Sequence, residues 1–331
     1  MLTIVVVADQ LRGLRPAHDS TVAIMEEVQA LGHRLLVTTP EQLGVRNSRA
    51  VARCAPVHLR PGELVNGTWK VATDWWQAES PQNIALDDAD AVLMRADPPV
   101  DANYLRATYL LDQIDPRRTL LLNAPHGLRE TNEKLFTLRF PALIPDTVVS
   151  ADPVELADLA RAWGRAVLKP TDAMAGRGVL LLRSDDLNLH SLLHTATEYG
   201  RRHVVAQRWV DTRSGDRRVI VLDAEPVGVV RRLAAPGDFR CNMAAGANVV
   251  ADTVTTLDKK ICSALAPELR RLGIMLAGLD VIGDRLIEVN ITSPTGLREI
   301  DALTGSRLAR LVVERIEDRC AQMRDGAAPA S

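Results

Sequence analysis

The chain has 331 residues, of which 47% are hydrophobic and 25% charged, the balance of an ordinary globular protein. This length allows two or three modest domains with a sizeable core. The formal net charge of -2 gives no reason to expect nucleic-acid or membrane binding, and no apolar run is long enough to cross a bilayer. Four scattered cysteines without metal or redox spacing fit a reducing cytoplasm, where we expect the protein to lie.

The first 123 residues are typical of an α/β domain. Strand, capped helix and strand follow one another, which indicates a β-α-β unit and a parallel sheet. No glycine fingerprint follows the first strand, which argues against dinucleotide binding. Residues 41–85 are less regular, with Trp69, Trp75 and Trp76 as packing anchors. The expected strands are residues 4–7, 34–38, 91–94 and 119–122, and the expected helices are 19–31 and 104–114.

Two charged residues, Arg95 and Asp97, follow the expected strand at 91–94. Open α/β sheets bind ligands beyond the carboxyl ends of their strands, so both residues are candidates for substrate binding. A surface ion pair explains the pattern equally well, and both interpretations stay open at this point.

The middle of the chain predicts a hairpin around residues 170–178. An apolar strand ends at Lys169, and another begins at Val179. The small residues between them allow backbone N–H groups to fold over a phosphate, although a plain hairpin turn is the simpler reading. Only five of the 40 basic residues are lysine, so a retained lysine suggests a need for a compact point charge.

A second hairpin, residues 278–295, carries the strongest chemical signal. A three-residue turn at 283–285 would place Asp280 opposite Glu288 and gather the apolar residues on the other face, whereas a two-residue turn would separate the two acids. We therefore predict the three-residue turn. Asn290 shares the polar face, and two carboxylates with a carboxamide suit Mg²⁺ shared with phosphates. A solvated polar face is the alternative.

The remaining segments complete the expected organisation. Residues 234–248 form a flexible stretch rich in Ala and Gly, and helices are expected at 258–272 and 304–320. Arg298 and Glu299 are placed to lock the loop before them by an ion pair. Residues 321–331 are expected to form a disordered tail.

Several motifs, in this order, resemble the ATP-grasp superfamily and, within it, the bacterial glutathione synthetase family. They are LMRADPP at 93–99, NEKLFT at 132–137, LKP at 168–170, GLDVIGDRL at 278–286 and EVNITSPT at 288–295. The resemblance implies an ATP-grasp fold, α/β and α+β, preceded by an N-terminal Rossmann-like α/β domain. It implies three parts, residues 1–123, an ATP-grasp N-lobe at 124–207 and a C-lobe at 208–320.

The resemblance also implies a reaction and its partners. ATP would phosphorylate the carboxylate of γ-glutamylcysteine, and the amine of glycine would attack the acyl phosphate to give glutathione. ATP and Mg²⁺, or Mn²⁺, would be required. The partners would be small molecules, a dipeptide or amino acid and an amine acceptor, with no nucleic acid or membrane, and the chain would form a homodimer or homotetramer.

Site residues follow from the resemblance by position in this sequence. The implied metal ligands are Asp280, Glu288 and Asn290, and the implied catalytic residues are Arg218, Arg240 and Asn242. The implied substrate residues are Arg95, Asp97, Arg232, Ser293 and Thr295. The implied nucleotide residues are Lys134, Lys169, Met174, Gly176, Gly178, Gln207, Trp209, Val210 and Asp216, with residues 173–178 as a lid.

Two departures from the family pattern keep other functions open. The lid has alanines where the family usually has glycines, and Asn248 stands where the family usually has glycine followed by arginine. A ligase of the same chemistry that joins another pair of substrates is therefore the first alternative. A nucleotide-binding protein without ligase activity is the second.

Overall fold

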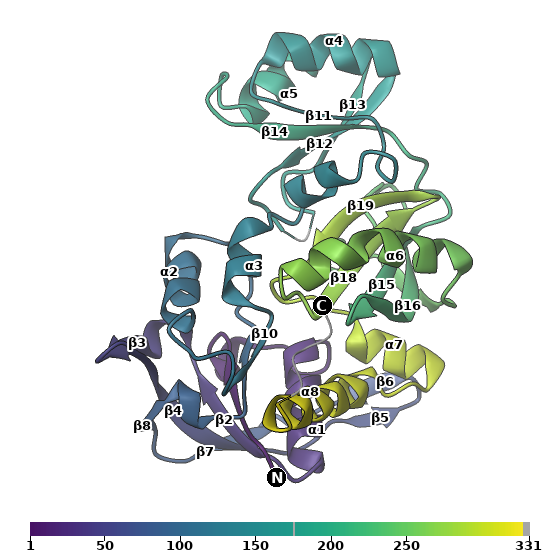
Figure 1. Cartoon of the computed structure of the whole chain (residues 1–331). Coiled ribbons are helices and arrows are strands. Elements are labelled where there is room, and N and C mark those ends of the chain that lie inside the picture. Colours follow the sequence, from purple (N-terminus) through teal and green to yellow (C-terminus); the bar gives the residue numbers. More distant parts are fainter. Residues whose placement is uncertain (175, 327–331) are drawn as a thin grey trace.

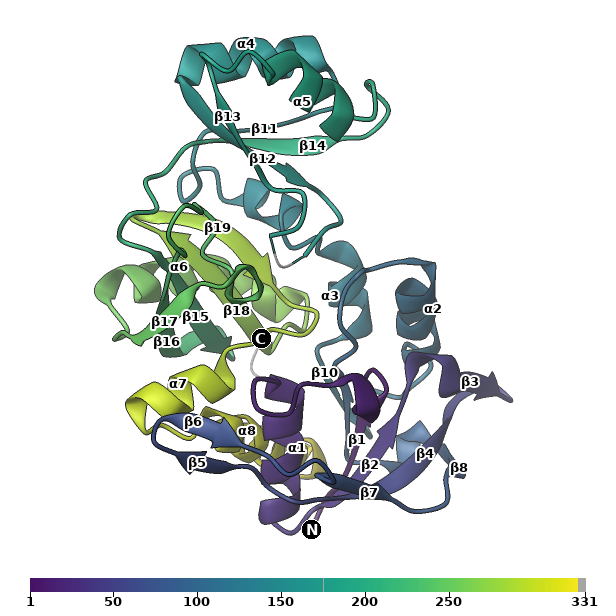
Figure 2. The ribbon, with the colours of Figure 1, turned by 180° about the vertical axis from the view of Figure 1, so that it is seen from behind.

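The computed structural model describes residues 1–174 and 176–326. The chain folds into three parts that lie one above another, and Figures 1 and 2 show them from opposite sides. An N-terminal α/β domain lies at one end, an antiparallel lobe that we call the N-lobe lies at the other, and the C-lobe lies between them. Over the described ranges, no helix is long and apolar enough to cross a membrane.

The N-terminal domain is built on one mixed sheet with the strand order β10-β9-β1-β2-β4-β3. Its elements are β1 (Thr3–Val7), η1 (Leu11–Gly13), α1 (Ser20–Ala30), β2 (Arg34–Thr38), η2 (Pro40–Gln42), β3 (Leu43–Arg46), β4 (Arg49–Leu59), β5 (Glu63–Val65), β6 (Thr68–Lys70), β7 (Trp76–Ala78), β8 (Gln82–Ala85), η3 (Leu86–Asp88), β9 (Ala91–Met94), α2 (Ala102–Leu111), β10 (Leu120–Leu122) and α3 (Pro125–Glu130). The four parallel strands are those that the β-α-β pattern predicted. The stretch expected to be irregular adds antiparallel strands to the sheet and a separate two-stranded hairpin, β5–β6.

The N-lobe is a four-stranded antiparallel sheet, β11-β14-β12-β13, with two helices on its outer face (Figure 1). Its elements are η4 (Leu135–Arg139), β11 (Thr147–Ser150), α4 (Pro153–Trp163), β12 (Arg165–Pro170), β13 (Leu180–Arg183), α5 (Leu189–Ala196) and β14 (Val204–Arg208). Asp152 caps α4 through the N–H of Val154. The hairpin β12–β13 carries the lid at its tip.

The C-lobe is a five-stranded antiparallel sheet, β17-β16-β15-β18-β19, covered by α6. Its elements, with the two helices that follow, are β15 (Asp216–Leu222), β16 (Glu225–Leu233), η5 (Met243–Ala245), β17 (Asn248–Ala251), α6 (Thr256–Arg271), β18 (Leu276–Ile282), β19 (Arg285–Asn290), α7 (Leu297–Thr304) and α8 (Leu308–Arg324). Helix α8 returns to the N-terminal domain and packs on α1.

The turn of the hairpin β18–β19 differs from the prediction. It has two residues, with Ile282 opposite Arg285, and not the three that we expected. A β-bulge at the level of Asp280 and Val281 then inserts one residue in β19, so Asp280 still lies opposite Glu288 as predicted. Because of the bulge, Leu286 replaces Ile287 in the core, and Ile287 faces the cleft described below.

The C-terminal segment is also more ordered than predicted. The closing helix expected at 304–320 is α8, which begins at Leu308 and continues through Arg324, so residues 321–324 are helical and not a tail. Cys320 is buried, and Arg324 forms an ion pair with Asp90 of the N-terminal domain, which holds the last turn in place. The last five residues of the expected tail, 327–331, lie outside the described residues.

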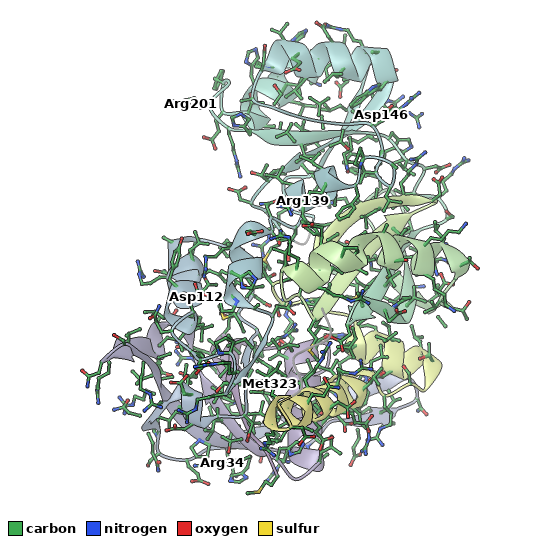
Figure 3. All side chains as sticks on the ribbon, viewed as in Figure 1. Arg34, Asp112, Arg139, Asp146, Arg201 and Met323 are labelled. Atoms are coloured by element: carbon green, nitrogen blue, oxygen red, sulfur yellow. The ribbon has the colours of Figure 1, made fainter. Side chains whose placement is uncertain are left out.

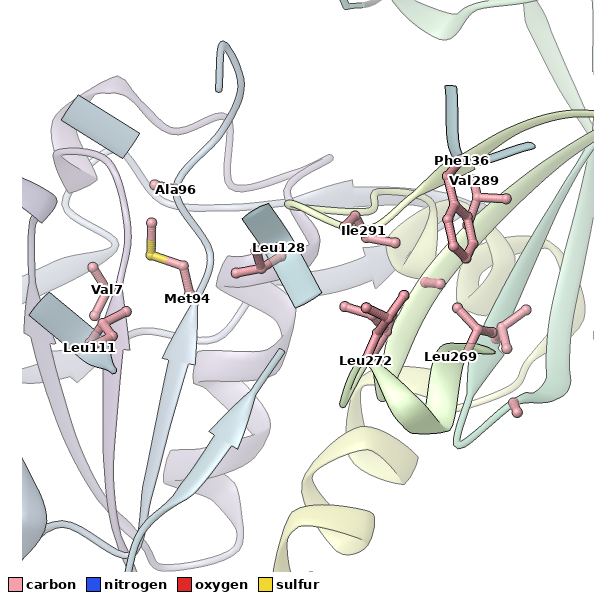
Figure 4. Packing of buried hydrophobic residues seen from close by; sticks show 14 of the residues in the cluster. Val7, Met94, Ala96, Leu111, Leu128, Phe136, Leu269, Leu272, Val289 and Ile291 are labelled. Carbon is pink, nitrogen blue, oxygen red and sulfur yellow. The ribbon is translucent and has the colours of Figure 1, made fainter. Parts of the chain in front are cut away.

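Apolar packing joins the N-terminal domain to the C-lobe. One cluster runs from Val7 and Met94 through Leu128 of α3 to Leu272 and Ile291 (Figure 4). Charged side chains cover the outside of all three parts; the arginines labelled in Figure 3, Arg34, Arg139 and Arg201, are each exposed. The cores of the N-terminal domain and the C-lobe are therefore continuous, whereas the N-lobe has its own core.

Candidate active site

A cleft lies between the N-lobe and the C-lobe, open to solvent on one side. It is lined by strand ends, by the lid and by the loop between β16 and β17. The predicted residues that line it are Lys134, Lys169, Met174, Gly176, Gln207, Trp209, Val210, Asp216, Arg240, Asn242, Asp280 and Glu288. The structure thus brings most of the predicted nucleotide residues and both predicted carboxylates to one place.

Asp280 lies at the floor of this cleft and contacts two arginines. Its Oδ1 accepts hydrogen bonds from Arg218 Nε at 2.7 Å, and Arg232 Nη2 lies 3.0 Å away. Arg232 is itself held by Asp216, whose two carboxylate oxygens each accept a hydrogen bond of 2.6 Å from its guanidinium. The register of β15, β16 and β18 places these four side chains on one face of the sheet.

The pKa values of the two acids in this cluster, Asp280 and Asp216, are shifted in opposite directions. Burial alone would raise the pKa of Asp280, but the charges of Arg218 and Arg232 outweigh it and hold the pKa below its ordinary value. Burial raises the pKa of Asp216 to about 6 against the pull of Arg232. Asp280 therefore stays ionised at neutral pH, as a cation ligand must.

The two predicted lysines enter the cleft from the N-lobe side. Lys134 Nζ lies 3.1 Å from Glu288 Oε1 and donates to the carbonyl oxygen of Ala173 at 2.5 Å. Lys169 Nζ donates to Gln207 Oε1 at 2.5 Å. Burial lowers the pKa of Lys169 to about 8, only partly opposed by Glu288. Both amines thus lie where they can exchange a protein partner for a phosphate oxygen.

The donor set fits a hard divalent cation. Asp280 and Glu288 lie opposite each other and are both neutralised by cationic side chains, which shows that this face requires positive charge. Asn290, two residues beyond Glu288, donates from Nδ2 to the carbonyl of Gly278, which leaves Oδ1 for a ligand. In the part of the chain that the structure describes, no group of three His, Cys, Asp or Glu side chains forms a closed metal cage. Phosphate and water oxygens would have to complete the coordination, as is usual for Mg²⁺.

Two loops meet across the cleft. Arg240 Nη1 donates to the carbonyl oxygen of Gly176 in the lid at 3.2 Å, and Asp238 holds the same guanidinium. Phe239 packs edge-on against Trp209, with 5.9 Å between the ring centroids. Of the lid residues, Ala175 lies outside the described residues, and Gly178 does not line the cleft but packs near Pro170.

The predicted substrate residues lie at the seam between the C-lobe and the N-terminal domain. Arg95 is buried and donates to Thr21 Oγ1 and to the carbonyl oxygen of Pro294, so it is not half of a surface ion pair. Burial raises the pKa of Asp97, against the opposing effect of the nearby Ser293. The carbonyl oxygen of Thr295 accepts a hydrogen bond from Arg218. None of these predicted substrate residues lines the cleft. Arg218 and Arg232 lie behind Asp280 and do not line it either.

The expected ion pair between Arg298 and Glu299 is wrong. Arg298 pairs with Glu26 and Glu299 with His18, because adjacent residues on a helix point in different directions.

Sequence reasoning missed several residues of the cleft and also Glu133, which precedes Lys134 and does not itself line the cleft. Glu133 Oε1 accepts hydrogen bonds from Thr292 Oγ1 and from two backbone N–H groups, and burial followed by the charge of Glu288 raises its pKa. Its place in the motif at 132–137 could have identified it. The apolar lining, which has no such signal, consists of Pro145, Val167, Val179, Phe239, Cys241, Ile282 and Ile287.

Comparisons with known proteins agree with this architecture. The chain matches the family models of the prokaryotic glutathione synthetase N-terminal domain at residues 2–129 and of the prokaryotic glutathione synthetase ATP-grasp domain at residues 133–305. It is 45% identical over 308 residues to the glutathione synthetase of Synechocystis sp., covering 93% of this chain and 96% of that protein. It is 37% identical over 319 residues to that of Brucella melitensis, covering 96% and 99%.

Solved structures show the same fold at lower identity. A RiPP-associated ATP-grasp ligase of Chryseobacterium gregarium matches with a TM-score of 0.63 at 14% identity, covering 96% of this chain and 97% of that one. The D-cycloserine synthetase DcsG matches with a TM-score of 0.61 at 15% identity, covering 95% and 99%. The predicted ATP-grasp fold with a preceding N-terminal domain is confirmed, and the chain belongs to the prokaryotic glutathione synthetase family of ATP-dependent ligases.

Proposed function

We propose that this protein joins γ-glutamylcysteine to glycine with ATP, giving glutathione, ADP and phosphate. The observation that carries the proposal is the pair Asp280 and Glu288, opposed on one sheet face and neutralised by cations at the floor of an interlobe cleft. Membership of the family and coverage of nearly the whole chain support the same reaction. The relatives named glutathione synthetase supply the choice of substrates.

The reaction proceeds in two steps. A carboxylate oxygen of the dipeptide attacks the γ-phosphorus of ATP; an O–P bond forms, the bond to ADP breaks, and an acyl phosphate results. The amine nitrogen of glycine then attacks the acyl carbon; a C–N bond forms, the C–O bond breaks, phosphate leaves and the amine gives up a proton. Such phosphoryl transfer depends mainly on positioning and neutralisation of charge.

The residues of the cleft are suited to that task. Lys134 and Lys169 would contact phosphate oxygens from the N-lobe, while Gln207, Trp209 and Val210 would lie against the base. Asp280, Glu288 and Asn290 would hold Mg²⁺ or Mn²⁺, which supplies positive charge to the phosphate oxygens. Met174 and the rest of the lid, together with Arg240 and Asn242, would keep water from the acyl phosphate.

The arginines behind Asp280 have a different part in the proposal. Arg218 and Arg232 are used in this structure to neutralise Asp280 and Asp216. A cation bound to Asp280 would neutralise part of its negative charge in place of the two arginines. The positive charge of Arg218 and Arg232 would then act on the substrate carboxylate. The contacts of Arg218, Arg232, Ser293 and Thr295 with substrate stay predictions. The homodimer or homotetramer and the cytoplasmic location stay predictions as well.

A second candidate function is the same chemistry on another pair of substrates. The observation in its favour is Asn248, which is exposed at the start of β17 where the family usually has glycine and arginine.

The test is release of ADP by the purified protein with ATP, Mg²⁺, γ-glutamylcysteine and glycine, with mass spectrometry of the product. We expect glutathione in equal amount to ADP, and slower release when either substrate is omitted. A panel of other carboxylates and amines runs in parallel. Turnover on another pair and none on the first would contradict the proposal and favour the second candidate; ATP binding without ADP release on any pair would contradict both.

A further inference from the structure

The segment that follows β19 and includes the first residue of α7, residues 291–297, is held by side chains of the N-terminal domain. Asn123 Nδ2 donates to the carbonyl oxygen of Ile291 at 2.8 Å, and Arg95 Nη2 donates to that of Pro294 at 3.1 Å. Ser20 Oγ accepts hydrogen bonds of 3.2 Å from the N–H groups of Gly296 and Leu297. This segment, which we call the substrate loop, therefore takes its shape from residues far away in sequence.

Beyond the loop, Arg298 is packed between a ring and a carboxylate. Its guanidinium lies over the ring of Trp69, with 4.4 Å between its Cζ and the ring centroid, and its carbonyl oxygen accepts a hydrogen bond of 2.8 Å from Trp69 Nε1. Arg298 Nη2 lies 2.8 Å from Glu26 Oε1, at an angle outside hydrogen-bond geometry. Arg298 is 2% exposed, and its Nε and Nη2 have no hydrogen-bond acceptor within the described ranges. Charge and the ring face are therefore what hold this end of the guanidinium.

Trp69 belongs to a hairpin that makes few other connections to the fold. It lies on β6 of the two-stranded hairpin β5–β6, which pairs with no other strand in the part of the chain that the structure describes. The carboxylate of Glu26 also accepts the N–H of Gly62 at 3.0 Å, so it holds the base of this hairpin and Arg298 together. The hairpin adds little to the main core, yet it presents one tryptophan to the end of the substrate loop.

Arg218 links the loop to the reaction centre. Arg218 donates from Nη1 to the carbonyl oxygen of Thr295 at 3.1 Å and from Nε to Asp280 at 2.7 Å. A displacement of Thr295 would therefore change the position of Arg218, which neutralises the proposed metal ligand Asp280. Any residue that fixes the end of the loop can act on the site without touching it.

We propose that Trp69, together with Glu26, is a positioning residue that fixes the substrate loop through Arg298. The inference rests on the proposed function only for the role of Ser293 and Thr295 in holding the peptide. It predicts that Trp69 matters for the dipeptide substrate and not for ATP, because neither Trp69 and Arg298 nor the substrate loop lines the nucleotide cleft.

The kinetic test uses Trp69→Ala, Trp69→Phe and a matched control, Trp163→Ala. Trp163 is also half-buried but ends α4 in the N-lobe. We expect Trp69→Ala to raise the KM for γ-glutamylcysteine about tenfold with the KM for ATP unchanged, since a hydrogen bond and a cation–π contact are lost. Trp69→Phe keeps a ring face but lacks the N–H donor, and should fall between. An unchanged KM for the dipeptide, or an equal rise in both KM values, would overturn the inference.

A second measurement does not depend on any activity. Hydrogen exchange of the backbone amides of residues 291–297 should be faster in Trp69→Ala than in the wild-type protein or Trp163→Ala, with exchange at residues 204–208 unchanged. Unchanged exchange in the loop would overturn the inference. If the wild-type protein makes no glutathione, the proposed function fails, and the exchange result alone decides the role of Trp69.

Discussion

The interlobe cleft and the seam along the substrate loop are built in different ways. In the cleft, charged side chains point at one another and are joined by short contacts, such as that between Lys134 and Glu288. In the seam, side chains of the N-terminal domain bind backbone groups of the loop, as Ser20 does at Gly296. The cleft can exchange its partners for a ligand, whereas the contacts of the seam hold the loop in one shape. Changes in the cleft should therefore affect turnover, and changes in the seam should affect stability and peptide binding.

The largest effect is expected from Glu288→Gln. It removes one of two opposed acids, so folding should be preserved, and Lys134 loses an ionic partner that a phosphate can replace. Turnover should fall by about a hundredfold or more, because a bound metal ion supplies several kcal/mol of charge stabilisation. ADP release measures the effect, and thermal unfolding of the same variant is the control. Turnover near that of the wild-type protein would show that Glu288 holds no cation.

A change in the seam should lower stability and leave ATP binding almost unchanged. Ser20→Ala leaves two buried backbone N–H groups without their acceptor, and Ser20 is fully buried. We expect a loss of about 1–3 kcal/mol in the free energy of unfolding, measured by denaturant, with little change in the affinity for ATP. The exposed Ser184→Ala is the matched control. If Ser20→Ala weakened ATP binding and left stability unchanged, the contrast between cleft and seam would be lost.

Closure of the lid can be tested at Gly176. A Cβ at this position would lie 2.6 Å from Asn242 Oδ1, and the backbone has a φ of +74°. Gly176→Ala should lower kcat about tenfold, because the lid and the loop of Asn242 can no longer meet and water reaches the acyl phosphate. Gly237→Ala, with a φ of +84° and nothing within 4 Å, carries the same backbone strain without the collision. Equal effects of the two variants would mean that strain, and not contact between the loops, is responsible.

The last prediction concerns pH. Since burial lowers the pKa of Lys169 to about 8, the amine is charged below that pH and increasingly neutral above it in the free protein. Binding of a phosphate should then require uptake of a proton, so the Kd for ATP should be flat below pH 8 and rise by up to tenfold per pH unit above it. Calorimetry in two buffers measures the proton. Lys169→Met should bind ATP more weakly and show no such rise; an identical pH profile in the variant would contradict this assignment.

Patterns of residue type predicted the cleft better than the seam. Alternation along β18 and β19 was enough to place Asp280 and Glu288 opposite each other, whereas Lys134 and Lys169 were identified through the family resemblance. The predicted length of the turn was wrong, because a bulge shifts the pairing of the residues that follow it in the same way as one extra residue in the turn. Only the exchange of Leu286 for Ile287 in the core distinguishes the two arrangements.

The contacts of the seam could not be predicted, because they join residues far apart in sequence. Asn123 and Ile291 are 168 positions apart, and Trp69 and Arg298 are 229 apart. The sequence identified Trp69 only as a packing residue. Arg95 was correctly placed beyond the end of β9, but nothing in its neighbourhood indicated that its partner would be a backbone carbonyl of the other domain.

The central claim is that Asp280, Glu288 and Asn290 hold a divalent cation beside the phosphates of ATP. Its most direct test is anomalous diffraction from crystals grown with Mn²⁺ and a non-hydrolysable ATP analogue. We expect a manganese peak in coordination distance of Asp280 and Glu288, with Lys134 moved from Glu288 to a phosphate oxygen. A bound nucleotide without a peak at these residues, with Lys134 still paired to Glu288, would contradict the account.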